Sequence, residues 1–289
     1  MKDQLKIMTA VLILVVGFVT YYYASFTVSE KKIAELTLEE ETSKKEIPVD
    51  GSLFKILARE SDLEINYETK TVTYKNAEFK LKPEMMDVYY KIGLLNQSQN
   101  SVVVYPIFTE AAYNKNGFYD YYSKKCDSSC MTVPVQYNFS GEYSASRAGF
   151  NSLRLLGYHF ITDVDIDKNP EILKNYDKVI LLHNEYVTKT EFNALSKHPK
   201  IIYLYPNALY AEVTSNYNTD TITLVRGHGY PDEKIKNGFD WKFDNSNFEY
   251  DNSCTTWKFY EINNGIMLNC YPEYMIFKDE SLLERIKNY

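Results

Sequence analysis

The sequence has no excess of positive charge, no internal repeat and no low-complexity segment. It contains 32 Lys and Arg against 39 Asp and Glu, which gives a formal net charge of -7 at pH 7. Because proteins bind nucleic acids through a basic surface, this balance argues against a nucleic-acid partner. Hydrophobic residues make up 45% and charged residues 25% of the 289 positions, which excludes wholesale disorder and is typical of a globular chain.

The one long apolar run lies at the N-terminus. Lys2 and Lys6 precede an apolar stretch from Ile7 to Val28, and about 20 apolar residues are enough to cross a bilayer as a helix. We therefore expect residues 1–28 to be a transmembrane anchor, with a cytoplasmic N-terminus and the main domain outside the cell membrane. A cleaved signal peptide, which would leave a secreted protein, remains the alternative.

Cysteine is scarce, and its spacing is informative. The four cysteines are Cys126, Cys130, Cys254 and Cys270. An even number in a chain expected outside the cell, in two locally spaced pairs, predicts the disulfides Cys126–Cys130 and Cys254–Cys270. A zinc site is disfavoured because the CxxxC spacing differs from a zinc knuckle and no histidine lies nearby in sequence.

Three segments follow the apolar run. Residues 29–50 carry mixed charge and predict a stalk. Residues 51–98 predict a small α+β accessory unit, with a helix at 52–62 and a hairpin at 63–82. The main domain is expected at 99–289. The accessory unit has neither histidine nor cysteine, so we assign it a structural or docking role.

The main domain alternates apolar strands with short helices. The spacing predicts strands at 101–108, 132–139, 159–166, 178–184 and 200–207, and helices at 146–158, 169–176 and 188–198. Strands separated by helices of about ten residues are typical of βαβ units around a doubly wound, mostly parallel sheet. A β-rich extension and a final helix at 278–288 follow.

Polar residues gather where the predicted parallel strands end, an edge where α/β proteins place their ligands. His183 and Glu185 follow the fourth strand, and Asn207 follows the fifth. Tyr113 lies after the first strand. Tyr137 and Tyr143 follow the second strand, and His228 lies in a later turn from which it could reach this edge.

Residue types at this edge leave two chemistries open. No cysteine or serine occurs at 183–186, which excludes the nucleophile of a glutamine amidotransferase-like site. His183 and Glu185 could form an acid–base pair, since residues two apart on an extended chain point the same way. Carboxylate and phenol oxygens could instead hold a metal, with His183 as a base. Spacing alone does not choose between the two.

Three stretches carry a resemblance to a known family. "TEAAYNKNGFYDYY", "GYHFITDVDIDKNPEILKNYDKVILLHNEYVTKTEF" and "YPNALYAEV" cover about residues 100–215. In this order they resemble the catalytic domain of the large (beta) subunit of N,N-dimethylformamidase, an α/β domain with a glutamine amidotransferase-like, flavodoxin-like fold. The strongest element is the H-x-E-Y motif at 183–186.

The resemblance implies a mononuclear iron that activates water to hydrolyse an amide. Glu185 matches the carboxylate ligand and Tyr113 the first tyrosine ligand. Tyr143 or Tyr137 matches the second, with Tyr143 preferred because it follows a glycine just before a helix. His183 and Asn207 match positions around the metal, His183 as general base or orienter and Asn207 as hydrogen-bond donor to the amide. Combined with the anchor expected from the N-terminal apolar run, which is unusual for this family, the expectation is a membrane-anchored, extracytoplasmic amidohydrolase acting on a small amide.

The chain also departs from the family motifs. Glu110 and Val187 replace tryptophans, and Asn184 replaces an aspartate. The walls of a small amide pocket are therefore altered, and substrate choice does not transfer. A non-catalytic cell-envelope binding protein with the same fold is the alternative, and oligomerisation stays open.

Overall fold

The computed structural model describes residues 44–66, 71–74, 76–95, 97, 100–137, 143, 145–248 and 250–289. The expected anchor at 1–28 and most of the expected stalk lie outside these residues. Within the described ranges, no helix is long and apolar enough to cross a membrane. The chain divides into two compact units, described separately below.

The smaller unit contains described residues of 44–47 and 57–77. Strand β1 (Lys45–Glu46) pairs antiparallel with the end of β2 (Lys55–Ala58). A short 3-10 helix, η1 (Glu60–Asp62), leads into the antiparallel pair β3 (Leu63–Asn66) and β4 (Thr71–Tyr74). The hairpin was predicted. The helix predicted at 52–62 is wrong, because backbone pairing with β1 holds β2 extended and its burial alternates along the strand.

The larger unit, 48–56 and 78–289, is built on a six-stranded sheet in the order β14-β15-β11-β9-β6-β8. The strands are β6 (Ser101–Tyr105), β8 (His159–Thr162), β9 (Lys178–Leu181), β11 (Ile201–Tyr203), β14 (Phe259–Ile262) and β15 (Gly265–Leu268). All neighbouring pairs are parallel except β14–β15. The predicted mostly parallel α/β sheet is confirmed.

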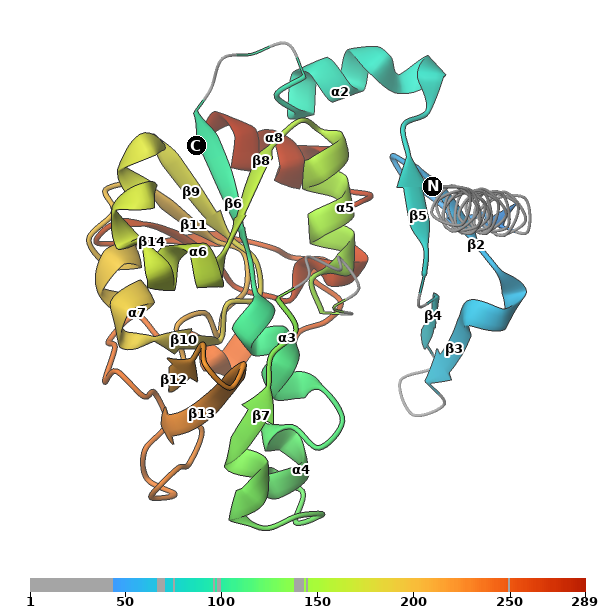
Figure 1. The fold of residues 1–289 in the computed structure, drawn as a ribbon. Helices are drawn as coiled ribbons and strands as arrows, with labels where there is room; N and C mark the ends of the chain where they lie inside the picture. Colours follow the sequence, from blue (N-terminus) through green and yellow to red (C-terminus); the bar gives the residue numbers. More distant parts are fainter. Residues whose placement is uncertain are drawn as a thin grey trace, which may run out of the picture. The chain divides into compact units, whose positions relative to one another are not determined.

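Helices cover both faces of this sheet (Figure 1). On one side lie α6 (Asp163–Lys168), η4 (Pro170–Asn175) and α7 (Lys189–Leu195), and α5 (Arg147–Leu155) and α8 (Glu280–Asn288) lie on the other. Side chains from α6, η4 and α7 share one buried core with alternate residues of the strands, among them Val102, Val104, Ile166, Leu173 and Leu195. Because alternate strand residues face opposite sides, the continuous apolar strands need helices on both faces.

A second, four-stranded sheet lies beyond the ends of the parallel strands. Its order is β10-β12-β13-β7, with β10 (Tyr186–Thr188), β12 (Ala211–Asn216), β13 (Thr221–Arg226) and β7 (Thr132–Pro134). The strand predicted at 132–139 is therefore shorter and belongs to this sheet, where β7 pairs antiparallel with β13. Pro134 has no backbone N–H, which suits the edge strand that β7 forms.

Threonine caps decide where two helices begin. The Thr188 hydroxyl accepts a hydrogen bond from the N–H of Glu191, and the Glu191 carboxylate accepts one from the N–H of Thr188. This capping box begins α7, in the helix predicted at 188–198. Thr162 and Asp165 form the same arrangement at the start of α6. The strand predicted at 159–166 therefore ends at Thr162.

The remaining elements are short and connect the sheets. They are β5 (Glu78–Lys80), η2 (Pro83–Met85), α2 (Met86–Ile92), α3 (Ile107–Tyr113), α4 (Phe118–Tyr122), η3 (Ser128–Met131), η5 (Ser246–Phe248) and η6 (Pro272–Tyr274). Of these, α3 and α4 follow β6 and lie at the end of the sheet where the polar residues were predicted to gather.

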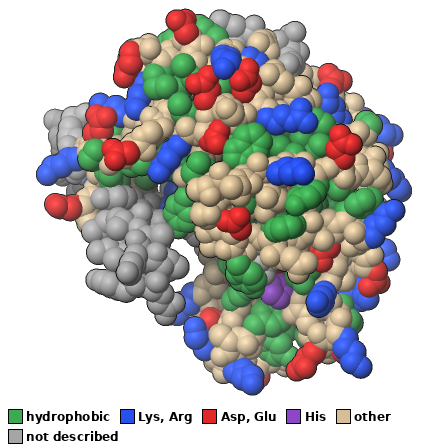
Figure 2. All heavy atoms as spheres, turned by 180° about the vertical axis from the view of Figure 1, so that it is seen from behind, with side chains coloured by type: hydrophobic (Ala, Val, Ile, Leu, Met, Phe, Trp, Pro, Cys, Tyr) green, Lys and Arg blue, Asp and Glu red, His purple; other side chains and the backbone are tan. Residues whose placement is uncertain are grey.

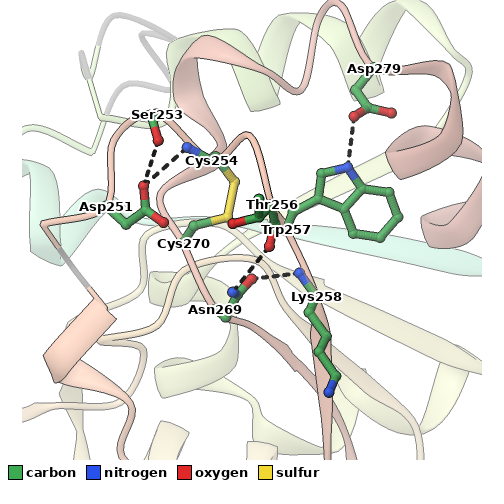
Figure 3. Close-up of a disulfide and its surroundings, with 9 residues drawn as sticks. All are labelled: Asp251, Ser253, Cys254, Thr256, Trp257, Lys258, Asn269, Cys270 and Asp279. Carbon is green, nitrogen blue, oxygen red and sulfur yellow. Dashed lines mark hydrogen bonds between the residues drawn. A yellow bond between two sulfur atoms is a disulfide. The ribbon is translucent and has the colours of Figure 1, made fainter.

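Both predicted disulfides are present, Cys126–Cys130 and Cys254–Cys270. The second closes the β14–β15 hairpin (Figure 3). Within that hairpin, Nε1 of Trp257 donates a 2.7 Å hydrogen bond to Asp279, the residue that also caps α8. This hydrogen bond therefore links the disulfide hairpin to the start of α8.

Charges of both signs are interspersed on the surface that Figure 2 shows. Lys and Arg side chains alternate there with Asp and Glu, and hydrophobic side chains form small groups. The described side chains drawn in Figure 2 thus form no broad basic area of the kind that binds phosphate backbones.

Candidate functional site

The turn between β9 and β10 is held by hydroxyl groups from two helices. The N–H groups of Glu185 and Tyr186 donate to Oγ1 of Thr109 at 3.0 and 3.1 Å. The N–H of His183 donates to Oγ of Ser146 at 3.2 Å. These bonds position the side chains of 183–185, all fully buried, beneath α3 and the start of α5.

Glu185 is the centre of a polar cluster. Its Oε2 lies 2.7 Å from the Tyr113 hydroxyl and 3.3 Å from Nε2 of His183. Its Oε1 lies 3.2 Å from Nε2 of His228 and 3.2 Å from the Tyr119 hydroxyl. Burial alone would raise the pKa of the Glu185 carboxyl, but hydrogen bonds from His183 and His228 outweigh burial and lower the pKa to about 2. Glu185 is thus a buried carboxylate that stays ionised.

His183 is also held by three tyrosines. The Tyr143 hydroxyl lies 2.7 Å from Nδ1, and the Tyr271 hydroxyl lies 2.9 Å from Nδ1 and 2.5 Å from Nε2. Tyr205 stacks on the imidazole with centroids 5.2 Å apart. Because an ionised carboxylate can only accept, Nε2 carries the proton that faces Glu185. Nδ1 is then the acceptor for the Tyr143 hydroxyl.

The phenols of Tyr113 and Tyr143 are neutral near pH 7. Burial raises the pKa of Tyr113 well above its ordinary value, and the negative charge of Glu185 raises it further. Burial likewise raises the pKa of Tyr143, helped by Tyr271 and Glu185. Tyr113 keeps 37% of its surface exposed while its hydroxyl points inward to Glu185. The Tyr113 ring therefore lies between the buried carboxylate and solvent.

His228 enters the cluster from the turn after β13. Its backbone is in the left-handed region with φ 56°, between Gly227 and Gly229, which also have positive φ. Its ring stacks on Tyr122 with centroids 4.9 Å apart, and its side chain is 24% exposed. The expectation that His228 can reach the strand ends is confirmed, and this residue forms a second solvent-facing wall.

The other predicted site residues lie apart from this hydrogen-bonded cluster. Tyr137 packs against Tyr217, with centroids 5.9 Å apart, and Lys168 lies over its ring. Asn207 is buried after β11, and its Oδ1 has no hydrogen-bond partner in the described part of the chain. Both side-chain polar atoms of the buried Asn184 are likewise unpaired there.

Two members of the cluster were missed from sequence. Tyr119 lies in the quoted "TEAAYNKNGFYDYY" stretch, where its place in the helix after Tyr113 was the available signal. Tyr271 directly follows Cys270, and its place near His183 depends on how the disulfide hairpin packs. No local pattern marks Tyr271.

Fold and site together define an α/β protein with a buried, charged polar cluster at the carboxyl ends of parallel strands. Within the ranges that the structure describes, no three His, Cys, Asp or Glu side chains are grouped so as to hold a metal ion. No protein-family model matches the chain, and no curated protein matches it significantly. The resemblance to the dimethylformamidase large subunit therefore rests on the quoted motifs alone.

Proposed function

We propose that the protein hydrolyses a carbon–nitrogen bond of a small amide, using a mononuclear iron held around Glu185. The observation that carries the proposal is the meeting of Tyr113, His183 and Glu185 from two separate strand ends. Tyr143 joins them through His183. These are the residues that the motifs single out. The chain has 27 tyrosines, and one matched to the motif by chance would have no reason to lie beside Glu185.

The donor set suits a hard, highly charged cation. Phenol and carboxylate oxygens are anionic once deprotonated, and metal binding releases the phenol protons. A buried carboxylate is costly without a positive partner, and Glu185 is both fully buried and ionised. Iron, when bound, would supply a Lewis acid that polarises the amide carbonyl. Two of the proposed donors are phenols, and a group of three His, Cys, Asp or Glu side chains is therefore not required.

The chain's own residues supply the proton chemistry in this proposal. With Glu185 engaged by a metal, His183 would carry its proton on Nδ1, towards the Tyr143 hydroxyl, and Nε2 would accept the proton of the attacking water and return it to the nitrogen that leaves. Tyr143 and Tyr271 hold the imidazole in place for this step. Asn207, buried at the end of β11, is the proposed hydrogen-bond donor to the substrate amide.

The location belongs to the proposal as well. We propose an N-terminal membrane anchor and an extracytoplasmic main unit, or a secreted chain if the apolar run is cleaved. Two disulfides support an oxidising compartment, where such bonds persist.

Metal analysis of the full chain, purified without chelator, tests the function. We expect iron near one equivalent per chain, a visible tyrosinate-to-iron charge-transfer band, and release of amine from one or more of a panel of formamides and acetamides. A colourless protein without iron would overturn the proposal. Bound iron without hydrolysis of any amide would point instead to a non-catalytic envelope protein with this fold.

A further inference from the structure

We infer that Tyr119, rather than Tyr143, supplies the second phenol oxygen of the metal site. The inference rests on the proposed function and changes one of its ligands. The Tyr119 hydroxyl lies 2.7 Å from that of Tyr113 and 3.2 Å from Oε1 of Glu185. The Tyr113 hydroxyl lies 2.7 Å from Oε2 of Glu185. The two phenols and the carboxylate thus close a triangle of oxygen donors.

Tyr143 occupies a different position. Its hydroxyl meets Nδ1 of His183 at 2.7 Å, while the opposite nitrogen of that imidazole faces Glu185 at 3.3 Å. The two rings lie parallel, with an interplanar angle of 5°. The imidazole therefore stands between Tyr143 and the carboxylate, which makes Tyr143 a positioning residue for His183.

The spacing of the triangle fits coordination of a small cation. Oxygen ligands about 2 Å from an octahedral ion are about 3 Å from their neighbours, and the three oxygen–oxygen separations of the triangle run from 2.7 to 3.2 Å. The Tyr119 hydroxyl also lies 3.0 Å from Nε2 of His228. One hydroxyl proton of Tyr119 cannot serve both Tyr113 and Glu185 at once. A cation in place of the phenol protons would satisfy the convergent oxygens.

Local sequence explains why Tyr119 reaches Tyr113. The chain doubles back between α3 and α4 at Gly117, where an added Cβ would collide with the carbonyl oxygen of Ala112. Only glycine permits this close approach. As a result the rings of Tyr113 and Tyr119 lie 4.2 Å apart between centroids, and both hydroxyls point to the carboxylate.

Ferric iron titrated into the full chain tests the assignment by visible absorption and by affinity, without reference to activity. Tyr119→Phe should lose about half of the charge-transfer intensity and bind iron about 10- to 100-fold more weakly. Tyr143→Phe should keep the charge-transfer intensity and the iron affinity of the unaltered chain. Tyr121→Phe, in the same helix but outside the triangle, is the matched control. Tyr119→His keeps a metal donor and should bind iron with a shifted band, which separates loss of a ligand from loss of fold.

The outcomes separate the two claims. If the unaltered chain binds no iron and shows no band, the proposed function and this inference both fail. If it binds iron, and Tyr143→Phe loses the band while Tyr119→Phe keeps it, only the assignment of Tyr119 is overturned. Circular dichroism of each variant confirms that the compared chains are folded.

Discussion

The hydroxyl of Tyr143 lies 2.7 Å from Nδ1 of His183, across 40 positions of sequence. This contact sets the orientation of the imidazole, because Nδ1 is occupied as an acceptor and Nε2 is left to face Glu185 at 3.3 Å. The histidine is therefore held between a neutral phenol and an ionised carboxylate.

Replacement of His183 should separate catalysis from metal binding. His183→Gln keeps a hydrogen-bonding side chain but removes the base, so we expect amide turnover to fall about 10²- to 10⁴-fold with iron content unchanged. Turnover assays with parallel metal analysis measure both quantities. Loss of iron together with activity would show that His183 is itself a ligand.

Glu185→Gln should abolish iron binding, because it removes the only carboxylate of the oxygen triangle. The neutral amide still accepts hydrogen bonds, so the chain is expected to remain folded. Glu110→Gln is a matched control, since Glu110 accepts from the Tyr105 hydroxyl at 2.9 Å in the adjoining helix. Full iron occupancy in Glu185→Gln, measured by titration against that control, would exclude Glu185 as a ligand.

Thr109→Val should destabilise the chain by about 1 to 3 kcal/mol for each buried N–H left without an acceptor. Thr109 accepts from both Glu185 and Tyr186, and valine has the same shape without the oxygen. Thr109→Ser retains the hydroxyl and should lose much less. Urea unfolding of the three chains measures the difference, and equal midpoints for Val and Ser would contradict this role.

Removal of the Cys254–Cys270 disulfide by a Ser/Ser pair should lower the free energy of unfolding by about 3 kcal/mol, from the entropy of a loop of this length. The cysteines are 16 positions apart in this pair and 4 apart in Cys126–Cys130. The shorter loop should contribute about 2 kcal/mol. Thermal unfolding of both double variants compares them, and a larger loss for the shorter loop would contradict the loop-entropy account.

The buried carboxyl of Glu273 should make the free energy of unfolding fall as the pH rises from 4.5 to about 7. Burial raises the pKa of its carboxyl from 4.5 to about 7, although hydrogen bonds from the Ala148 N–H and the Tyr205 hydroxyl oppose this. Between these two values the folded chain holds a proton that the unfolded chain has lost. The stability present below pH 4.5 is therefore lost progressively towards pH 7, by up to about 3 kcal/mol.

Glu273→Gln should remove that slope and leave a flatter profile between pH 4.5 and 7. Urea midpoints at several pH values provide the measurement. Glu185, whose pKa is lowered from 4.5 to about 2, changes stability in a different range. Its stabilising contribution is present above pH 4.5 and is lost as the pH falls towards 2. An unchanged slope in Glu273→Gln would show that this carboxyl is not the source.

Local patterns predicted the elements that depend on neighbouring residues. The apolar runs of β6 and β9 predicted buried parallel strands, and Thr188 predicted the start of α7. The predictions failed where backbone pairing partners are remote. Lys55–Ala58 is amphipathic enough to suggest a helix, yet β1 holds it extended. The pairing of β7 with β13 also lies outside any local window.

By itself, the sequence determined the alternation of strands and helices, the pairing of closely spaced cysteines and the placement of His183 and Glu185 at one strand end. These follow from periodicity, covalent chemistry and short-range spacing. Only the tertiary structure decided which tyrosines stand beside Glu185. Tyr113 and Tyr119 reach it because the chain reverses at Gly117, and His228 reaches it from a turn in another sheet. Such contacts depend on the packing of distant segments, which no local pattern encodes.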